Sequence, residues 1–190
     1  MKQLHDLLDD VRALEIRGAN TTITALEYDS RRVERGSCFF AVRGTASDGH
    51  AFIPAAIERG AVAIVCQELP IEINDDIAYV VVEDSNVAMA AMAASFYDHP
   101  TLELKLVGVT GTNGKTTTAT LLYDMFMAMG YKAGLISTVV YRIGERSIAS
   151  THTTPDAIRL NAMMREMVDE GCEYCFMECL HFYCCISAST

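Results

Sequence analysis

The sequence has few basic residues, no long apolar run and no repetitive tract, and each lack excludes a class of protein. Its 190 residues include 15 Lys and Arg against 25 Asp and Glu, a formal net charge of −10. Nucleic-acid-binding proteins normally present a basic face, so this balance argues against one. No stretch reaches the roughly eighteen consecutive apolar residues of a membrane span. The acidic N-terminus lacks the apolar core of a secretory signal, so we expect a cytoplasmic protein.

The hydrophobic content, 51% of the residues, favours a packed core and argues against a disordered chain. Residues 1–100 form a first predicted domain, which begins with a helix over 2–11 and includes a later helix with Ser85 as its N-cap. Residues 101–179 alternate strands and helices, with a single strand over 132–140. This alternation predicts a parallel sheet with helices on both faces. We expect a monomer.

Seven cysteines are unevenly placed, and five of them crowd the end of the chain. Without a secretory signal, a disulfide framework is not expected. A metal–thiolate cluster is one alternative, but a helix end and one extended strand do not easily bring such side chains to one ion. Cys38 and Cys66 lie in apolar runs and are expected to be buried thiols. The five terminal cysteines are Cys172, Cys175, Cys179, Cys184 and Cys185.

The segment "LVGVTGTNGKTTT" places a glycine-rich loop between a predicted strand and a predicted helix. Such a loop turns backbone N–H groups toward phosphate oxygens, and the start of the helix favours negative charge. A lysine can reach the terminal phosphates, and a threonine hydroxyl can bind Mg²⁺. The common motif would want glycine where Val109 stands, so a turn that binds nothing is the alternative. The predicted ATP-binding residues are Gly111, Thr112, Asn113, Gly114, Lys115, Thr116 and Thr117.

TGTNGKTTT resembles the ATP loop of the Mur ligases and of the related folylpolyglutamate synthases. The segments "DSRRVERGSCFFAVRG", "DGHAFI" and "AAIERGAVAIV" resemble the UDP-sugar-binding domain of two Mur ligases. The motif "HTTPD" resembles a motif in the branch of this family that adds the third amino acid to the peptide. The resemblance therefore implies a small UDP-binding α/β domain over 1–100, followed by a partial P-loop ATPase domain over 101–179.

The resemblance also assigns roles to individual residues. Lys115 and Glu178 are implied as catalytic residues, and Thr116 and Glu178 as Mg²⁺ ligands. Each assignment has a plainer alternative: a capped turn at Ser30, a helix cap at Thr154, or an ordinary carboxylate at Glu178. The implied contacts of the UDP-sugar peptide are Tyr28, Ser30, Thr45, Ala46, Ser47, His152, Thr153 and Thr154.

The implied reaction is ATP-dependent amide formation in peptidoglycan precursor synthesis in the bacterial cytoplasm. The substrate is UDP-N-acetylmuramoyl-L-alanyl-D-glutamate, and the added amino acid is meso-diaminopimelate or L-lysine. The carboxylate attacks ATP to give an acyl phosphate, and the incoming amine displaces phosphate. Two other classes stay open: a nucleotide- and UDP-sugar-binding fragment without catalysis, and a P-loop switch.

The end of the sequence departs from the family pattern. The relatives' EVSSH or ECSSH segment, the lysine that they carry carbamylated and the C-terminal domain do not follow Glu178. The codons of residues 185–190, read two bases later, can encode His-Gln-Arg-Ile-Asp, which resembles the segment after EVSSH. We therefore expect residues 180–190 to be an out-of-frame tail, and the fragment alone to be inactive in ligation.

Overall fold

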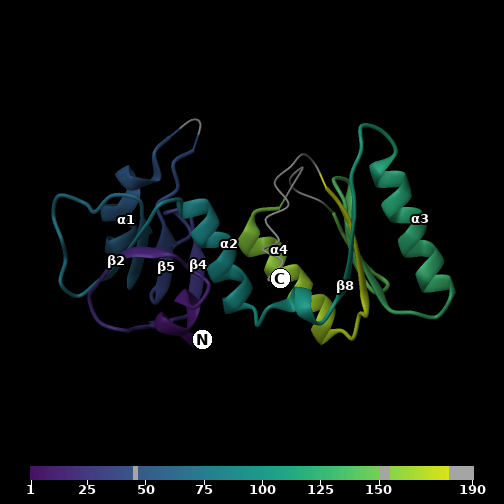
Figure 1. Ribbon diagram of the computed structural model, residues 1–190, viewed down its shortest axis with the longest axis horizontal. Helices are drawn as coiled ribbons and strands as arrows, with labels where there is room; N and C mark the ends of the chain where they lie inside the picture. The colour runs from purple at the N-terminus through teal and green to yellow at the C-terminus, as the bar shows by residue number, and fades with distance from the viewer. Residues whose placement is uncertain (45–46, 150–154, 180–190) are drawn as a thin grey trace. The chain divides into compact units, whose positions relative to one another are not determined.

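The computed structural model describes residues 1–44, 47–149 and 155–179, and the chain divides into two compact units, Met1–Phe96 and Tyr97–Thr190. Each unit is a five-stranded sheet with helices packed on its faces (Figure 1). The predicted α/β class is therefore confirmed. Among the described residues, no helix combines the length and the apolar character needed to cross a bilayer.

The first unit has its strands in the order β2-β7-β6-β5-β4. Strands β4 to β7 run parallel, and β2 pairs antiparallel with β7 at one edge. A separate antiparallel pair joins β1 and β3. The elements of this unit are β1 (Lys2–Gln3), η1 (His5–Leu8), β2 (Ala13–Arg17), β3 (Thr22–Ile23), β4 (Ala25–Glu27), β5 (Ser37–Phe40), η2 (Gly49–Phe52), α1 (Ile53–Glu58), β6 (Ala63–Cys66), β7 (Ala78–Val82) and α2 (Ser85–Phe96).

Helices cover both faces of this mostly parallel sheet, which is why its central strands β5 and β6 are buried along their whole length. Phe39 packs in one cluster with Ile53 and Ala56 of α1. Helix α2 contacts β5 and β6 as well as η1. All four residues of β5 and of β6 are buried. The sheet is thereby fixed between two layers, with the carboxyl ends of β4 to β7 at one edge.

Two local predictions for the first unit are wrong. The expected helix over 2–11 is a short strand followed by one 3₁₀ turn, because Lys2–Gln3 pairs with β3 instead of continuing a helix. The N-cap of α2 is Asp84, not Ser85. The Asp84 carboxylate accepts a hydrogen bond from Asn86 N (2.7 Å), and its carbonyl accepts one from Ala88 N. Ser85 Oγ is buried without a partner among the described residues.

The second unit has its strands in the order β11-β10-β9-β12-β8. Strand β12 lies parallel to both β9 and β8. The elements are η3 (Pro100–Leu102), β8 (Lys105–Val109), α3 (Lys115–Ala128), β9 (Ala133–Ile136), β10 (Val140–Ile143), β11 (Arg146–Ala149), α4 (Ala157–Asp169) and β12 (Tyr174–Glu178).

The prediction of a parallel sheet holds for β8, β12 and β9, whereas the prediction of a single strand over 132–140 is wrong. The expected strand over 132–140 ends at Ile136, and the chain turns back through an antiparallel β10–β11 hairpin. Its turn lies between the paired residues Ile143 and Arg146, with Gly144 at φ 53°. A two-residue turn that starts with a positive φ suits the twist of paired strands, and glycine adopts that conformation without strain.

Side chains of β12 alternate between the two helical layers, as the pleat of a strand requires. Phe176 packs with Ala119 and Tyr123 of α3. Cys175 and Met177 point to the opposite face, into the cluster that contains the methionines of α4. Figure 1 shows α3 and α4 on opposite sides of the sheet that contains β8. This packing sets the ends of β8, β9 and β12 side by side.

Candidate functional site

The glycine-rich loop has the context that the sequence predicts. Strand β8 ends at Val109, and α3 begins at Lys115. Gly114 is the N-cap of α3 and has φ 79°, a left-handed conformation that favours glycine. The first backbone hydrogen bond of α3 runs from Thr118 N to Gly114 O (2.8 Å). The amides before it are available to an anion, and the helix dipole adds partial positive charge.

Lys115 is the cation of this loop. Its ammonium group donates a hydrogen bond to the carbonyl oxygen of Gly111 (2.8 Å), so the side chain folds back over the loop. The contact is exposed, and a solvated hydrogen bond of this kind holds the side chain weakly. The ammonium is therefore close to any phosphate bound by the loop amides and free to turn toward it.

A polar cluster forms where three parallel strands end. Glu178 pairs with Val109 in register, so its carboxylate emerges beside the glycine-rich loop. Its Oε2 atom accepts hydrogen bonds from Thr116 Oγ1 (2.9 Å), Thr138 N (3.1 Å) and Thr138 Oγ1 (3.0 Å). Sequence reasoning named Thr116 and Glu178 but missed Thr138, whose only signal is its position just after the buried strand β9.

These contacts decide the protonation of Glu178. Burial raises its pKa, but the hydrogen bonds from Thr138 and Thr116 outweigh burial and bring the pKa below its usual value. The group is thus ionised at neutral pH. One carboxylate and one hydroxyl suit Mg²⁺, which keeps several waters and takes its other ligands from phosphates. No group of three or more His, Cys, Asp or Glu able to hold a metal occurs in the described part of the chain.

The first unit has its polar residues at the matching edge of its own sheet. Tyr28 and Ser30 follow β4, and Ser47 follows β5. Tyr28 is 42% exposed. Asp29 forms the capped turn that was one alternative: it accepts hydrogen bonds from Arg31 N and from the Arg31 guanidinium. That guanidinium lowers the pKa of Asp29 to about 2. Open α/β sheets bind ligands at this edge.

Several predicted residues lie outside the described part of the chain. The alternative of a helix cap at Thr154 is wrong, because the N-cap of α4 is Asp156, whose carboxylate accepts a hydrogen bond from Arg159 N (2.9 Å). Of the clustered cysteines, Cys175 is fully buried, and burial raises its pKa to about 12. A buried neutral thiol in the core is a poor metal ligand. The predicted residues that lie outside the described ranges are Thr45, Ala46, His152, Thr153, Thr154, Cys184 and Cys185.

Comparison with protein families and curated sequences gives consistent matches. Residues 22–97 match the model described as "Mur ligase family, catalytic domain", and residues 109–182 match the "Mur ligase middle domain". The chain is 52% identical over 178 residues to the UDP-N-acetylmuramoyl-L-alanyl-D-glutamate--2,6-diaminopimelate ligase of Cytophaga hutchinsonii, covering 93% of this chain and 37% of that protein. The Bacteroides fragilis ligase of the same name is 51% identical, with 36% of its length covered.

Solved structures agree on the fold. A ligase of that same name superposes with a TM-score of 0.69 at 23% identity, over 83% of this chain and 32% of the other. The MurF ligase of Thermotoga maritima, solved with ADP, gives 0.55 at 25% identity over the same shares. The chain thus spans little more than a third of the length of the curated relatives that it matches. On the two family models, the curated relatives and the fold together, the chain belongs to the Mur ligase family.

Proposed function

We propose that this chain supplies the UDP-sugar-binding and ATP-binding parts of a ligase that joins an amino acid to UDP-N-acetylmuramoyl-L-alanyl-D-glutamate. The observation that carries the proposal is the pairing of Thr116 with Glu178 beside the glycine-rich loop. A hydroxyl and a carboxylate at that place would supply two ligands to a magnesium ion that takes its others from water and a bound triphosphate. The names of the relatives support 2,6-diaminopimelate over L-lysine as the added amino acid.

In the proposed reaction, the D-glutamyl carboxylate attacks the γ-phosphorus of ATP and releases ADP, and the incoming amine then displaces phosphate from the acyl phosphate. The protein positions the reactants and neutralises charge. The loop amides from Gly111 to Thr117 hold the phosphates, and Lys115 neutralises the terminal ones. Thr116 and Glu178 would hold Mg²⁺, which supplies further charge neutralisation when bound.

For the UDP-sugar, we propose contacts with Tyr28, Ser30 and Ser47, which follow β4 and β5, and with Thr45 and Ala46. We propose that residues 152–154 meet the muramoyl peptide. The location of the first group is supported by the general binding of ligands at this edge of parallel sheets. A P-loop switch is less favoured, because it gives the first unit no role.

Calorimetric titration of the 190-residue chain tests the proposal. We expect it to bind Mg·ATP and, at a separate site, UDP-N-acetylmuramoyl-L-alanyl-D-glutamate. Lys115→Met should weaken Mg·ATP binding at least tenfold, about 1.4 kcal/mol, and leave the UDP-sugar unaffected. Lys132→Met is the matched control, because Lys132 precedes β9 at the opposite edge of the sheet. Equal Mg·ATP affinity in wild type and Lys115→Met would refute the proposed role of the loop lysine.

The same chain tests the alternative of a binding fragment. We expect the 190 residues alone to form no amide product from ATP, the UDP-sugar peptide and diaminopimelate. Product formed by the purified chain, measured by mass spectrometry, would show that the binding units also catalyse. Absence of both binding events would instead reject the ligase proposal itself.

A further inference from the structure

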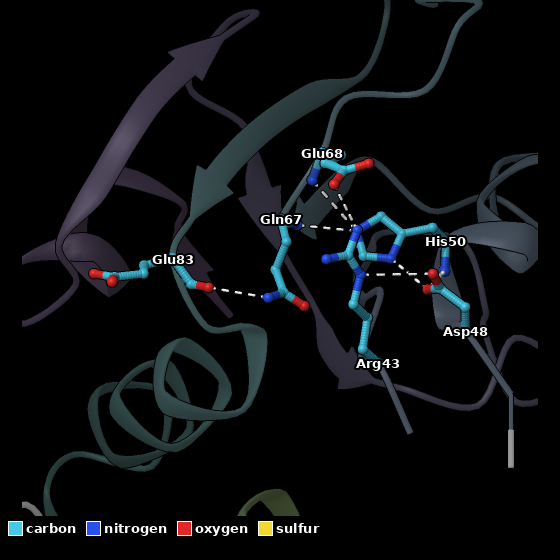
Figure 2. Close-up of polar contacts among 6 residues, drawn as sticks. All are labelled: Arg43, Asp48, His50, Gln67, Glu68 and Glu83. Carbon is cyan, nitrogen blue, oxygen red and sulfur yellow. Dashed lines mark hydrogen bonds and ion pairs between the residues drawn. The ribbon is translucent and has the colours of Figure 1, made fainter. Parts of the chain in front are cut away.

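The Asp48-Gly49-His50 triplet forms a cluster at the carboxyl ends of β5 and β6 that the proposed reaction does not use. His50 lies on η2, and its side chain is 15% exposed. Figure 2 shows its ring between the carboxylate of Asp48 and the backbone at Gln67 and Glu68, with Arg43 beside it. The cluster thus joins the loop after β5 to the segment that follows β6.

The hydrogen bonds of His50 fix its tautomer. Backbone amides can only donate, and Nε2 is the atom that faces Gln67 N (3.0 Å) and Glu68 N (3.4 Å). Nε2 must therefore be the unprotonated acceptor. Nδ1 lies 2.6 Å from Asp48 Oδ1, an acceptor, so Nδ1 carries the proton. The ring is a neutral bridge between Asp48 and the backbone after β6.

The two ends of the loop from Arg43 to Asp48 are joined to each other next to the His50 ring. Arg43 and Asp48 form an isolated β-bridge, and Gly44 N donates to Ser47 O (3.0 Å). The Arg43 guanidinium pairs with Asp48 (3.6 Å) and with Glu68 (2.7 Å). The charged groups around the His50 ring are therefore Arg43, Asp48 and Glu68. These interactions tie both ends of the loop to β6.

The triplet requires a glycine at its centre, Gly49, because the chain at Val42 lies too close for any side chain. A Cβ atom at this position would lie 2.6 Å from both Val42 N and Val42 O. Gly49 N also donates to Val42 O (2.9 Å), so the chain that leaves the loop lies directly against the chain that enters it. The approach brings Asp48 into position to cap η2, where its carboxylate accepts from His50 N (3.0 Å).

The network continues to the next strand. The Gln67 side chain donates to the carbonyl oxygen of Glu83, after β7 (3.0 Å). Figure 2 shows this chain of contacts from Arg43 through Asp48, His50 and Gln67 to Glu83. The ends of three neighbouring parallel strands are thus cross-linked along the edge where the UDP-sugar is proposed to bind. Such a network holds the two ends of the loop, 43–44 and 47–48, before the ligand arrives, which lowers the entropic cost of binding.

We infer that His50 is a positioning residue for UDP-sugar binding: its neutral ring fastens the base of the loop at 43–48 to the end of β6. The inference rests on the proposed function, because Ser47 belongs to the proposed UDP contacts. His50 itself need not touch the ligand. Loss of the bridge should weaken UDP-sugar binding through a loosened loop, without affecting ATP in the other unit.

Calorimetric titration with UDP-N-acetylmuramoyl-L-alanyl-D-glutamate tests the inference on four chains. His50→Ala should raise the Kd about tenfold, because it removes the bridge to Gln67. His50→Gln supplies an uncharged acceptor near the position of Nε2 and should stay within about threefold of wild type. His5→Ala, at an exposed histidine of the same unit, should match wild type. Equal affinity in His50→Ala and wild type would overturn the inference.

A second readout separates positioning from general stability. Trypsin cleaves after Arg43, so the rate of native-state cleavage there reports how firmly the loop base is held. His50→Ala should speed this cleavage severalfold. Ile64→Val, a fully buried change that destabilises the same unit, should leave the loop protected relative to other sites. Equal acceleration by both variants would mean that His50 acts only through stability.

Nitrogen NMR of the histidine rings distinguishes failure of the inference from failure of the proposed function. The Nδ1–H tautomer of His50 is expected, and an Nε2–H tautomer would overturn the bridge. If wild type shows the bridge and the protected loop but binds no UDP-sugar, the proposed ligand of the first unit is wrong. If His50→Ala does not fold, the test rests on His50→Gln. A folded His50→Gln chain whose Kd for the UDP-sugar rises more than about threefold would overturn the inference.

Discussion

Replacement of Glu178 by glutamine is the sharpest test of the cluster beside the glycine-rich loop. The change keeps the size of the side chain and one acceptor oxygen, so the donors at Thr116 and Thr138 can still be satisfied. It removes the negative charge, which the proposed Mg²⁺ would require. The expected outcome is a unit that still folds but responds weakly to Mg·ATP.

The magnitude follows from the three hydrogen bonds that Glu178 accepts. A bond to a charged group contributes about 1.5–3 kcal/mol and a neutral one about 0.5–1.5. Because all three donors share one oxygen of a half-buried carboxylate, we expect a total loss of about 1–2 kcal/mol. For a domain of under about 100 residues, that lowers Tm by roughly 5–15 °C.

The response to Mg·ATP should change more clearly. At a concentration of about 100 Kd, ligand adds about 2.7 kcal/mol to the stability of wild type. If loss of the metal interaction weakens binding about thirtyfold, the same ligand concentration is only about 3 times the Kd of Glu178→Gln. The ligand then adds about 0.8 kcal/mol to the stability of that variant. The corresponding Tm increases are roughly 10–20 °C for wild type and 3–6 °C for Glu178→Gln.

Differential scanning calorimetry with and without Mg·ATP, and with ATP plus chelator, measures both quantities. Glu145→Gln is the matched control, because Glu145 is an exposed glutamate in the hairpin turn of the same unit. It should behave as wild type in every arm. A full Mg·ATP-dependent increase of Tm in Glu178→Gln would refute the assignment of Glu178 as a metal ligand.

Two further predictions concern stability. The lowered pKa of Asp29, about 2, means that its contact with Arg31 stabilises the first unit above pH 4 and is lost as the pH falls from 4 to 2; Asp29→Asn should flatten the dependence of Tm on pH in that window, and an unchanged slope would contradict this. A Cβ atom at Gly134 would lie 2.3 Å from Met167 Sδ, so Gly134→Ala should cost about 1–3 kcal/mol in urea unfolding. Met167→Ala in the same chain should relieve part of that cost, whereas strictly additive losses would exclude the clash.

Local signals predicted much of the second unit correctly. The apolar run, the glycines and the residues after them correctly predicted a strand, a tight loop and a helix in that order. Phosphate binding by the loop stays a prediction. The predictions failed where the pairing of a strand depends on residues far away in the sequence. The segment predicted as one strand over 132–140 is apolar except for Lys132, Ser137 and Thr138. The Ser-Thr pair alone did not indicate that the chain turns before Val140 and pairs back on itself. The buried positions of Tyr141 and Ile143 alternate as a strand requires, and Gly144 marks the turn.

The helix caps show the same limit at smaller scale. Asp84 and Ser85 are both good N-cap residues, as are Thr154 and Asp156. The choice depends on which residue leaves the helical conformation first, and packing of the helix against its sheet decides that. Ser85 lies inside the first turn with its hydroxyl buried, so Asp84 takes the cap.

The sequence by itself determined the α/β class and the place of the glycine-rich loop between a strand and a helix, and it singled out Thr116 and Glu178, which the structure joins by a hydrogen bond. These predictions depend on residue type and short spacing, and therefore not on the order of the strands in the sheet. Only the tertiary structure brought Thr138 to Glu178 and His50 to Gln67. Those contacts join segments that are 40 and 17 residues apart, and they exist because parallel strands end at a common edge.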